Sequence, residues 1–239
     1  MIYLLYLFFG LAPSVIWLLL YLRKDAHPES KRMVIRIFLY GMLIAIPAIF
    51  FEKGFFEISS KIPLSELSLT IVNVFLGVAL IEEVLKYVVV REKVLKNSAL
   101  DEPTDLMVYM IIAALGFAAV ENILVLLSPT KTLLIQEASL ITIFRFVGAT
   151  FLHALASGTI GYFLAQYFFK QKTKFLIFGF SLAVILHGIF NFIIILVYEK
   201  KLEGTIGFLA VAAILLFFAL FVNFAFRKLK KLPSISQIK

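Results

Sequence analysis

The chain contains no cysteine, and this absence removes several classes of protein at once. Without thiols there are no disulfides, no thiolate metal ligands and no cysteine nucleophile. Any bound metal must therefore be held by histidine, carboxylate or amide oxygen. Charged residues are also scarce, at 16% of 239 residues, whereas 62% are hydrophobic and the mean hydropathy is +1.01. This composition predicts a polytopic membrane protein without a sizeable soluble domain.

Several motifs of intramembrane chemistry are missing as well. The sequence has no His-Glu-x-x-His pair, no Gly-x-Ser-x-Gly elbow, and no aspartate in the middle of an apolar run, as an aspartyl dyad would need. The last apolar run contains no lysine that could form a retinal Schiff base. The formal charge of +8 does not indicate a nucleic-acid partner, because the basic residues cluster at the ends of apolar runs.

Seven apolar runs are long enough to cross a bilayer, which takes about 20 helical residues. They lie near 2–22, 33–51, 68–90, 105–127, 139–169, 175–198 and 205–226. The sequence therefore predicts an all-α bundle of about seven transmembrane helices, organised as one domain over 1–239. The fifth run is long enough for a tilted helix or one that extends beyond the bilayer. The mixed-charge segment 52–66 is expected to be a loop in the membrane interface.

The distribution of basic residues predicts the orientation of the bundle. Fifteen lysines and arginines fall in 23–32, 91–101, 170–174 and the tail from Arg227, against five in the alternate loops. Because basic loops stay in the cytoplasm, the N-terminus is predicted outside and the C-terminus inside. No basic residue precedes the first run and no small-residue cleavage site follows it, so we expect it to remain as a membrane helix.

Polar side chains inside the apolar runs are the strongest functional signal. An ionised group at bilayer depth is costly unless it is paired or hydrated, so such residues usually serve a purpose. The set contains three carboxylates, two cations, two imidazoles and two amides: Glu82, Glu83, Lys86, Glu121, Asn122, Arg145, His153, His187 and Asn191. This concentration predicts an intramembrane active site.

The first cluster joins two adjacent glutamates to one lysine. Lys86 lies four residues after Glu82 and three after Glu83, so on a helix it reaches either carboxylate. A structural ion pair between helices is the alternative interpretation. Two carboxylates and one ammonium still leave excess negative charge in a low dielectric, which a proton or a cation must compensate.

Two of the three histidines lie inside apolar runs and suggest a metal. Each could be a hydrogen-bonded core residue, but two on separate helices beside carboxylates resemble the His/His/Glu set that leaves zinc an open position. We expect a divalent metal, Zn²⁺, held by Glu83, His153 and His187. Asn191 shares a helical face with His187 and could orient the imidazole or donate to an oxyanion.

The remaining polar residues have more than one possible role. Glu121 and Asn122 follow the small residues of 116–120, which would let a helix or a substrate segment approach. Glu121 lies nearer the outer end of its run. It could therefore line the path by which water or substrate enters from outside, instead of taking part in the reaction. Arg145 precedes His153 by two helical turns and is expected on a similar face, as a counter-ion, an interfacial cation or a catalytic group. Small residues over 148–161 predict that the helix of His153 is buried in the bundle.

Together these motifs resemble the PrsW family of membrane-embedded proteases over about 80–195. The resemblance is carried by Glu82-Glu83-x-x-Lys86, the 116–122 segment, His153, His187-Gly188-x-x-Asn191, and Glu102-Pro103 with Asp105. More distantly the chain is similar to the CAAX prenyl protease and bacteriocin-immunity superfamily. That superfamily has Phe-x-x-x-His where this chain has Phe117-x-x-x-Glu121, and this difference favours the PrsW branch. It also leaves open a metal-free mechanism in which a glutamate activates the water.

The resemblance implies a metalloprotease of a prokaryotic cell membrane. It would cleave a membrane protein with a single transmembrane helix, such as an anti-sigma factor, within or beside the lipid bilayer. Glu82 or Glu83 is expected to act as general base. Asn191, Asn122 or Arg145 would stabilise the oxyanion, and Lys86 would keep the glutamates ionised.

Two other classes of function remain open from the sequence. A proton- or cation-coupled transporter also buries chains of ionisable groups. Such transporters usually carry internal repeats and broken helices, and no repeat is visible in this sequence. A membrane scaffold related to the proteases would keep the polar cluster for assembly, and would tolerate Glu→Gln changes that the enzyme would not.

Overall fold

The computed structural model describes residues 2–24, 29–97, 100–127 and 133–234, and every regular element in these ranges is helical. In chain order the elements are α1 (Ile2–Leu22), α2 (Lys31–Ser59), α3 (Glu66–Val72), a π-helical segment (Asn73–Leu80), α4 (Ile81–Lys93), α5 (Pro103–Leu126), α6 (Ile135–Val147), α7 (Ala149–Lys170), α8 (Lys174–Tyr198) and α9 (Gly204–Leu229). They form seven stretches long and apolar enough to cross a membrane, with 66–93 and 135–170 each counted as one. The predicted all-α bundle is confirmed.

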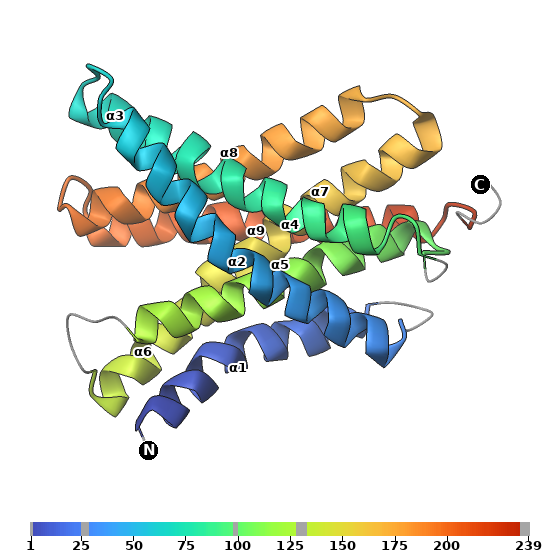
Figure 1. The fold of residues 1–239 in the computed structure, drawn as a ribbon, viewed down its shortest axis with the longest axis horizontal. Helices are drawn as coiled ribbons and strands as arrows, with labels where there is room; N and C mark the ends of the chain where they lie inside the picture. The colour runs from blue at the N-terminus through green and yellow to red at the C-terminus, as the bar shows by residue number, and fades with distance from the viewer. Residues whose placement is uncertain (1, 25–28, 98–99, 128–132, 235–239) are drawn as a thin grey trace.

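The start of α1 and the end of α9 lie at opposite ends of the bundle, as an odd number of spans requires (Figure 1). Large apolar side chains face outward along the peripheral helices, among them Phe50 on α2 and Phe217 on α9. A protein in water would bury such side chains, so these faces suit a lipid environment. The N-out direction stays a prediction.

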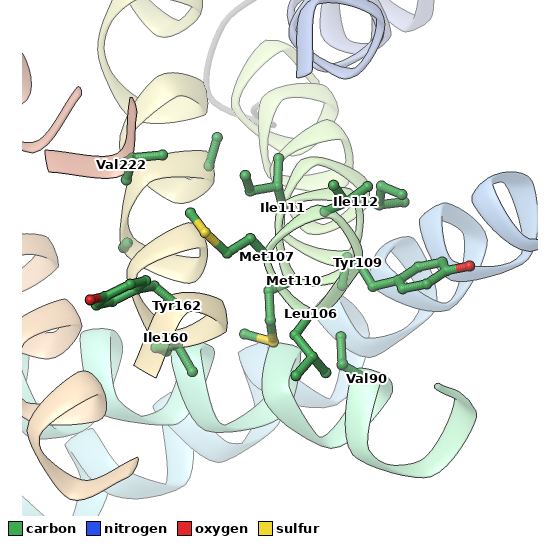
Figure 2. Close-up of a cluster of buried hydrophobic side chains, with 14 of the residues drawn as sticks. Val90, Leu106, Met107, Tyr109, Met110, Ile111, Ile112, Ile160, Tyr162 and Val222 are labelled. Carbon is green, nitrogen blue, oxygen red and sulfur yellow. The ribbon is translucent and has the colours of Figure 1, made fainter. Parts of the chain in front are cut away.

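Helices α5 and α7 form the centre of the molecule, and the other helices pack around them (Figure 1). Nearly every residue of α5 from Pro103 to Ala119 is buried, as expected for a helix that is apolar on all sides. Figure 2 shows the core around α5, where Met107 and Met110 extend between α5 and the α7 residues Ile160 and Tyr162. This core supports the polar residues that follow on the same two helices.

Glycines let α5 come very close to its neighbours. A Cβ on Gly116 of α5 would lie 2.1 Å from the carbonyl oxygen of Phe38, and one on Gly41 of α2 would lie 2.1 Å from that of Ala113. On the other side, a Cβ on Gly161 of α7 would lie 2.6 Å from a backbone atom of α5. Since lipid supplies no hydrophobic force between helices, such close backbone packing is a main source of stability.

Two boundaries differ from those expected from the sequence. Helix α2 continues to Ser59, so 52–59 is helical and not an interfacial loop; its last turns are held because Phe55 packs against the π-helical segment at Gly77. The fifth span is not one long helix, since α6 ends at Val147 and α7 begins at Ala149. Between them Gly148 leaves helical geometry, with φ −105° and ψ −97°.

Candidate active site

The polar cluster begins where the π-helical segment passes into α4. A π turn holds more residues than an α turn, so it rotates the residues that follow around the helix axis, and such turns are frequent at functional sites. In α4 the buried polar residues are Glu82, Glu83 and Lys86, which face the centre of the bundle. A membrane helix can carry these charges only on an inward face, because lipid cannot solvate them.

Lys86 is the hub of a buried ion network. Its Nζ donates to Glu83 Oε1 at 2.8 Å and to Glu82 Oε2 at 3.0 Å, and it lies 2.8 Å from His153 Nδ1. The ammonium also sits 4.5 Å from the centre of the Phe117 ring, a cation–π distance. The predicted reach of Lys86 to both glutamates is thus present, and the network extends to α7.

Each histidine has one ring nitrogen held by a carboxylate. His153 Nε2 is 2.7 Å from Glu121 Oε2, and His187 Nδ1 is 3.1 Å from Glu83 Oε1. The opposite nitrogens face Glu82 Oε2, at 3.7 Å from His153 Nδ1 and 4.0 Å from His187 Nε2. The two rings are 5.0 Å apart and nearly perpendicular. Carboxylates placed in this way orient metal-binding imidazoles and fix which nitrogen is free to ligate.

The residues that could hold a metal are therefore Glu82, His153 and His187, whose ligand atoms lie within 4.8 Å of one another. The set expected from the sequence has Glu83 in the place of Glu82. Adjacent residues point about 100° apart on a helix, so only one of the two glutamates can face both imidazoles. Glu83 is fully buried, accepts a hydrogen bond from Ser157 Oγ at 2.7 Å, and holds Lys86 and His187 with its other oxygen.

This donor set fits a divalent metal in kind. Two imidazoles and one carboxylate are the ligands of a catalytic zinc site that keeps one position open. Ligand atoms of a tetrahedral zinc lie roughly 3.3–3.6 Å apart, slightly closer than the 3.7 and 4.0 Å found here. Lys86 Nζ contacts two of the three ligand atoms, Glu82 Oε2 and His153 Nδ1, so a metal ion would require the ammonium to turn toward Glu83.

The carboxylate of Glu121 extends the network toward α6. Arg145 Nη2 lies 3.1 Å from Glu121 Oε2, and Arg145 Nε donates to Asn122 Oδ1. Asn122 in turn donates to Thr150 Oγ1 at 3.0 Å and to the carbonyl oxygen of Gly10 at 3.3 Å. Asn122 is buried behind Arg145, so its contacts position the guanidinium rather than reach into the cavity.

A cavity of about 370 Å³ opens beside the two histidines. Its polar lining consists of Glu121, Arg145, His153, His187 and Asn191. At about 30 Å³ for each water molecule, it has room for roughly a dozen waters or a short segment of polypeptide. Asn191 makes no side-chain hydrogen bond with the described residues, so its amide is available to a ligand in the cavity.

The break between α6 and α7 brings Arg145 and His153 to the same carboxylate. A helix end leaves carbonyl groups without partners, and here Trp17 Nε1 donates to the carbonyl oxygen of Phe146 at 2.8 Å. The indole also stacks on Phe151, with ring centres 4.2 Å apart. The single tryptophan of the chain therefore anchors the break from α1.

Several residues of the site were not singled out from the sequence. Ser157 was interpreted only as a small packing residue, Trp17 carried no signal beyond its rarity, and Glu52 was assigned to a loop. Glu52 instead lines a second cavity, of about 60 Å³, together with Glu82 and Glu121. The phenylalanines after Glu52 continue a helical apolar pattern, and this signal could have placed Glu52 within α2.

The Glu102-Pro103 motif with Asp105 lies at the start of α5, outside the polar cluster. Asp105 Oδ2 accepts hydrogen bonds from the backbone amides of Asp101 at 3.0 Å and Glu102 at 2.7 Å. This is a capping arrangement, with proline in the first turn where its missing amide hydrogen is not needed. The motif thus caps the start of α5 and affects the site only by fixing where this central helix begins.

Comparison with known proteins agrees with this geometry. The model of the PrsW family of intramembrane metalloproteases matches residues 29–223. Protease PrsW of Oceanobacillus iheyensis is 33% identical over 187 residues, covering 77% of this chain and 80% of that protein. Protease PrsW of Geobacillus kaustophilus is 32% identical over 189 residues, 78% of each chain, and that of Bacillus subtilis is 26% identical over 243 residues, 96% of each. No solved structure gives a significant match.

Proposed function

Since this chain belongs to the PrsW family of intramembrane metalloproteases and is a membrane-embedded protease, we propose a specific activity for it. It hydrolyses a peptide bond in a membrane protein with a single transmembrane helix, such as an anti-sigma factor, and requires a divalent metal, Zn²⁺. The observation that best supports this proposal is the group of Glu82, His153 and His187 beside a cavity. Each histidine is hydrogen-bonded through its other ring nitrogen to a carboxylate, His153 to Glu121 and His187 to Glu83. Family membership also favours the enzyme over the transporter and the scaffold.

The metal would be held by Glu82, His153 Nδ1 and His187 Nε2. When bound, it would supply a Lewis acid that polarises a carbonyl oxygen and makes water easier to deprotonate. Glu83 and Glu121 keep the two imidazoles in the required tautomer and orientation, because each accepts from the ring nitrogen that faces away from Glu82. Lys86, whose side chain is fully buried, offsets the negative charge of the two glutamates.

Glu121 is the carboxylate best placed to act as general base. Its side chain is 36% exposed and lines the cavity, whereas that of Glu83 is 0% exposed and has both oxygens engaged. In the proposed reaction Glu121 takes a proton from water while the water oxygen attacks the peptide carbonyl carbon. The proton then passes to the peptide nitrogen as the C–N bond breaks. Asn191 and Arg145, which line the same cavity, donate to the oxyanion.

One observation favours a second candidate, glutamate-dependent hydrolysis without metal. Lys86 Nζ is 2.8 Å from His153 Nδ1 and 3.0 Å from Glu82 Oε2, so an ammonium lies against two of the three candidate ligand atoms. In that case Lys86 is the permanent cation of the site. Glu121 would still activate water, with the imidazoles acting as hydrogen-bond donors.

Metal analysis of detergent-purified protein separates the two candidates. The metal-dependent enzyme should carry about one zinc per chain, and His187→Ala should lose it. Asn191→Ala is the matched control, since it changes the same cavity one helical turn away and should keep the metal while cleavage falls. A metal-free wild type that remains active in chelator would establish the second candidate.

The substrate is found by comparing membranes that contain wild type or Glu82→Gln. A single-pass protein that is shortened with wild type and stays full length with Glu82→Gln is the candidate, to be confirmed by cleavage with purified components. If wild type cleaves no single-pass protein in either setting, the proposed function is wrong.

A further inference from the structure

A larger cavity adjoins the 370 Å³ cavity beside the two histidines. It has a volume of about 650 Å³ and lies between the α6–α7 break, α8 and α9. Phe144, Phe190 and Ile194 line both cavities, so the larger cavity continues into the one beside the histidines. The larger cavity is lined almost entirely by apolar side chains, and we refer to it as the lateral groove.

The lateral groove is open toward the surrounding lipid. Three of its lining side chains are strongly exposed: Phe144 at 63%, Phe208 at 62% and Leu216 at 63%. In the described part of the chain, α6 packs against α1, α5 and α7, and has no substantial packing against α8 or α9. The bundle is thus incomplete between α6 and the α8–α9 pair, at the level of the active site.

We infer that the lateral groove docks the transmembrane helix of the substrate and guides its unwound end past Phe190 into the catalytic cavity. This inference rests on the proposed function and names the place where the substrate binds. The groove follows α9 from Gly204 to Ala219, about 22 Å at 1.5 Å per residue. That length covers much of the hydrocarbon thickness of roughly 30 Å, as a docked helix requires.

The junction of the two cavities argues for a polypeptide rather than a lipid chain. A transmembrane helix hides its peptide bonds in its own hydrogen bonds, and unwinding it in lipid leaves those groups without partners. Asn191 and Arg145, each next in sequence to a residue shared by the two cavities, line the catalytic cavity, and the amide of Asn191 has no side-chain partner among the described residues. They can bond the exposed peptide groups at the place where a substrate helix must open, whereas an acyl chain could use neither.

Two adjacent alanines on α9 give a matched test. Ala212 and Ala213 are both exposed, but Ala212 lines the groove and Ala213 is turned about 100° away around the helix. The probes are the single-pass protein identified above and a short soluble peptide that contains only its cleavage sequence. Ala212→Trp should lower kcat/KM for the single-pass protein by roughly tenfold and leave that for the peptide within about twofold. Ala213→Trp should change neither.

A crosslinking measurement covers the case in which a tryptophan variant folds poorly. Because the chain has no cysteine, Leu216→Cys in the Glu82→Gln background carries one reactive thiol. It should form a disulfide with a cysteine in the transmembrane helix of the probe protein. Leu220→Cys, equally exposed on the same helix but outside the groove lining, should not.

The outcomes separate this inference from the proposed function. Normal cleavage of the single-pass protein by Ala212→Trp, or equal crosslinking at Leu216→Cys and Leu220→Cys, overturns the groove and leaves the protease intact. If Leu216→Cys reacts with small thiol reagents but never with the probe helix while wild type cleaves it, the groove holds lipid and the inference is wrong. If wild type cleaves no single-pass protein, the proposed function fails and the groove inference fails with it.

Discussion

The inner and outer sides of the active site are built in opposite ways. On the inner side, α2, α4, α5 and α7 meet so closely that Gly41 and Gly116 have no room for a Cβ, and the α4 residues Glu82, Glu83 and Lys86 are buried. On the outer side, α6 stands apart from α8 and α9, and two connected cavities reach the lipid. The same seven spans thus provide a tightly packed half and an open half.

This difference follows from what each side has to do in a bilayer. Charged groups must be held in fixed pairs, because lipid cannot solvate them when they separate. If the substrate is a transmembrane helix, as proposed above, it reaches the site sideways through lipid, which requires one side of the site to be free of tight helix packing. Apart from the candidate metal ligands, substitutions on the inner side should therefore act mainly on stability, and those on the outer side mainly on catalysis.

The largest expected effect is on the inner side, at Lys86. Lys86→Met leaves Glu83 as a fully buried carboxylate without its cation and should lower the free energy of unfolding by about 3–5 kcal/mol. Thermal unfolding in detergent measures this loss. Glu83→Gln combined with Lys86→Met should recover part of it, because Glu82 is then the only one of the two glutamates left without the cation. A double variant as unstable as Lys86→Met would show that the pair does not act as a unit.

The next effect is catalytic and belongs to the outer side. Glu121→Gln keeps the shape of the side chain but removes its capacity to accept a proton, so cleavage of the single-pass protein should fall by roughly 100-fold or more. Stability should change by about 1 kcal/mol or less, since the side chain is partly exposed to the cavity. Glu57→Gln, on the exposed end of α2, is the control and should leave both unchanged. Undiminished cleavage by Glu121→Gln would exclude it as the base.

A smaller effect tests whether the inner side is packed to its limit. Gly116→Ala places a methyl group 2.1 Å from the carbonyl oxygen of Phe38 and should destabilise the protein by about 1–3 kcal/mol. Gly54→Ala is the control, because Gly54 is likewise a glycine inside a membrane helix, α2, but has no atom within 4 Å of the added Cβ. Equal unfolding temperatures for the two variants would contradict a rigid inner side.

The smallest effect concerns the link between α1 and the break in the fifth span. Trp17→Phe keeps an aromatic ring against Phe151 but removes the hydrogen bond to the carbonyl of Phe146, which should lower stability by about 1 kcal/mol. Cleavage should fall a few-fold, because α6 carries Arg145. If stability and cleavage are both unchanged, Gly148 alone maintains the break and Trp17 has no part in positioning Arg145.

The sequence was sufficient for the number of spans and for most of the polar residues that lie in or beside the cluster, though not for Glu52 or Ser157. Both depend on a property that acts residue by residue, the free energy of placing a side chain in hydrocarbon, so they can be recognised without neighbours. The same reasoning could not find the end of α2. Its helix continues past Glu52 and Lys53 because Phe55 packs on another span, and a contact of that kind leaves only a weak trace in the local pattern.

Other features depended on tertiary structure alone. Membrane helices tolerate glycine in their interior, so Gly148 by itself did not distinguish a break from a continuous helix; the partner that stabilises the break, Trp17, lies more than a hundred residues earlier. The choice between Glu82 and Glu83 was also invisible in the sequence, because adjacent carboxylates are chemically equal. The π-helical segment sets how α4, which follows it, is turned about its axis. In that orientation Glu82 faces both imidazoles, whereas Glu83 is buried against Ser157 and Lys86.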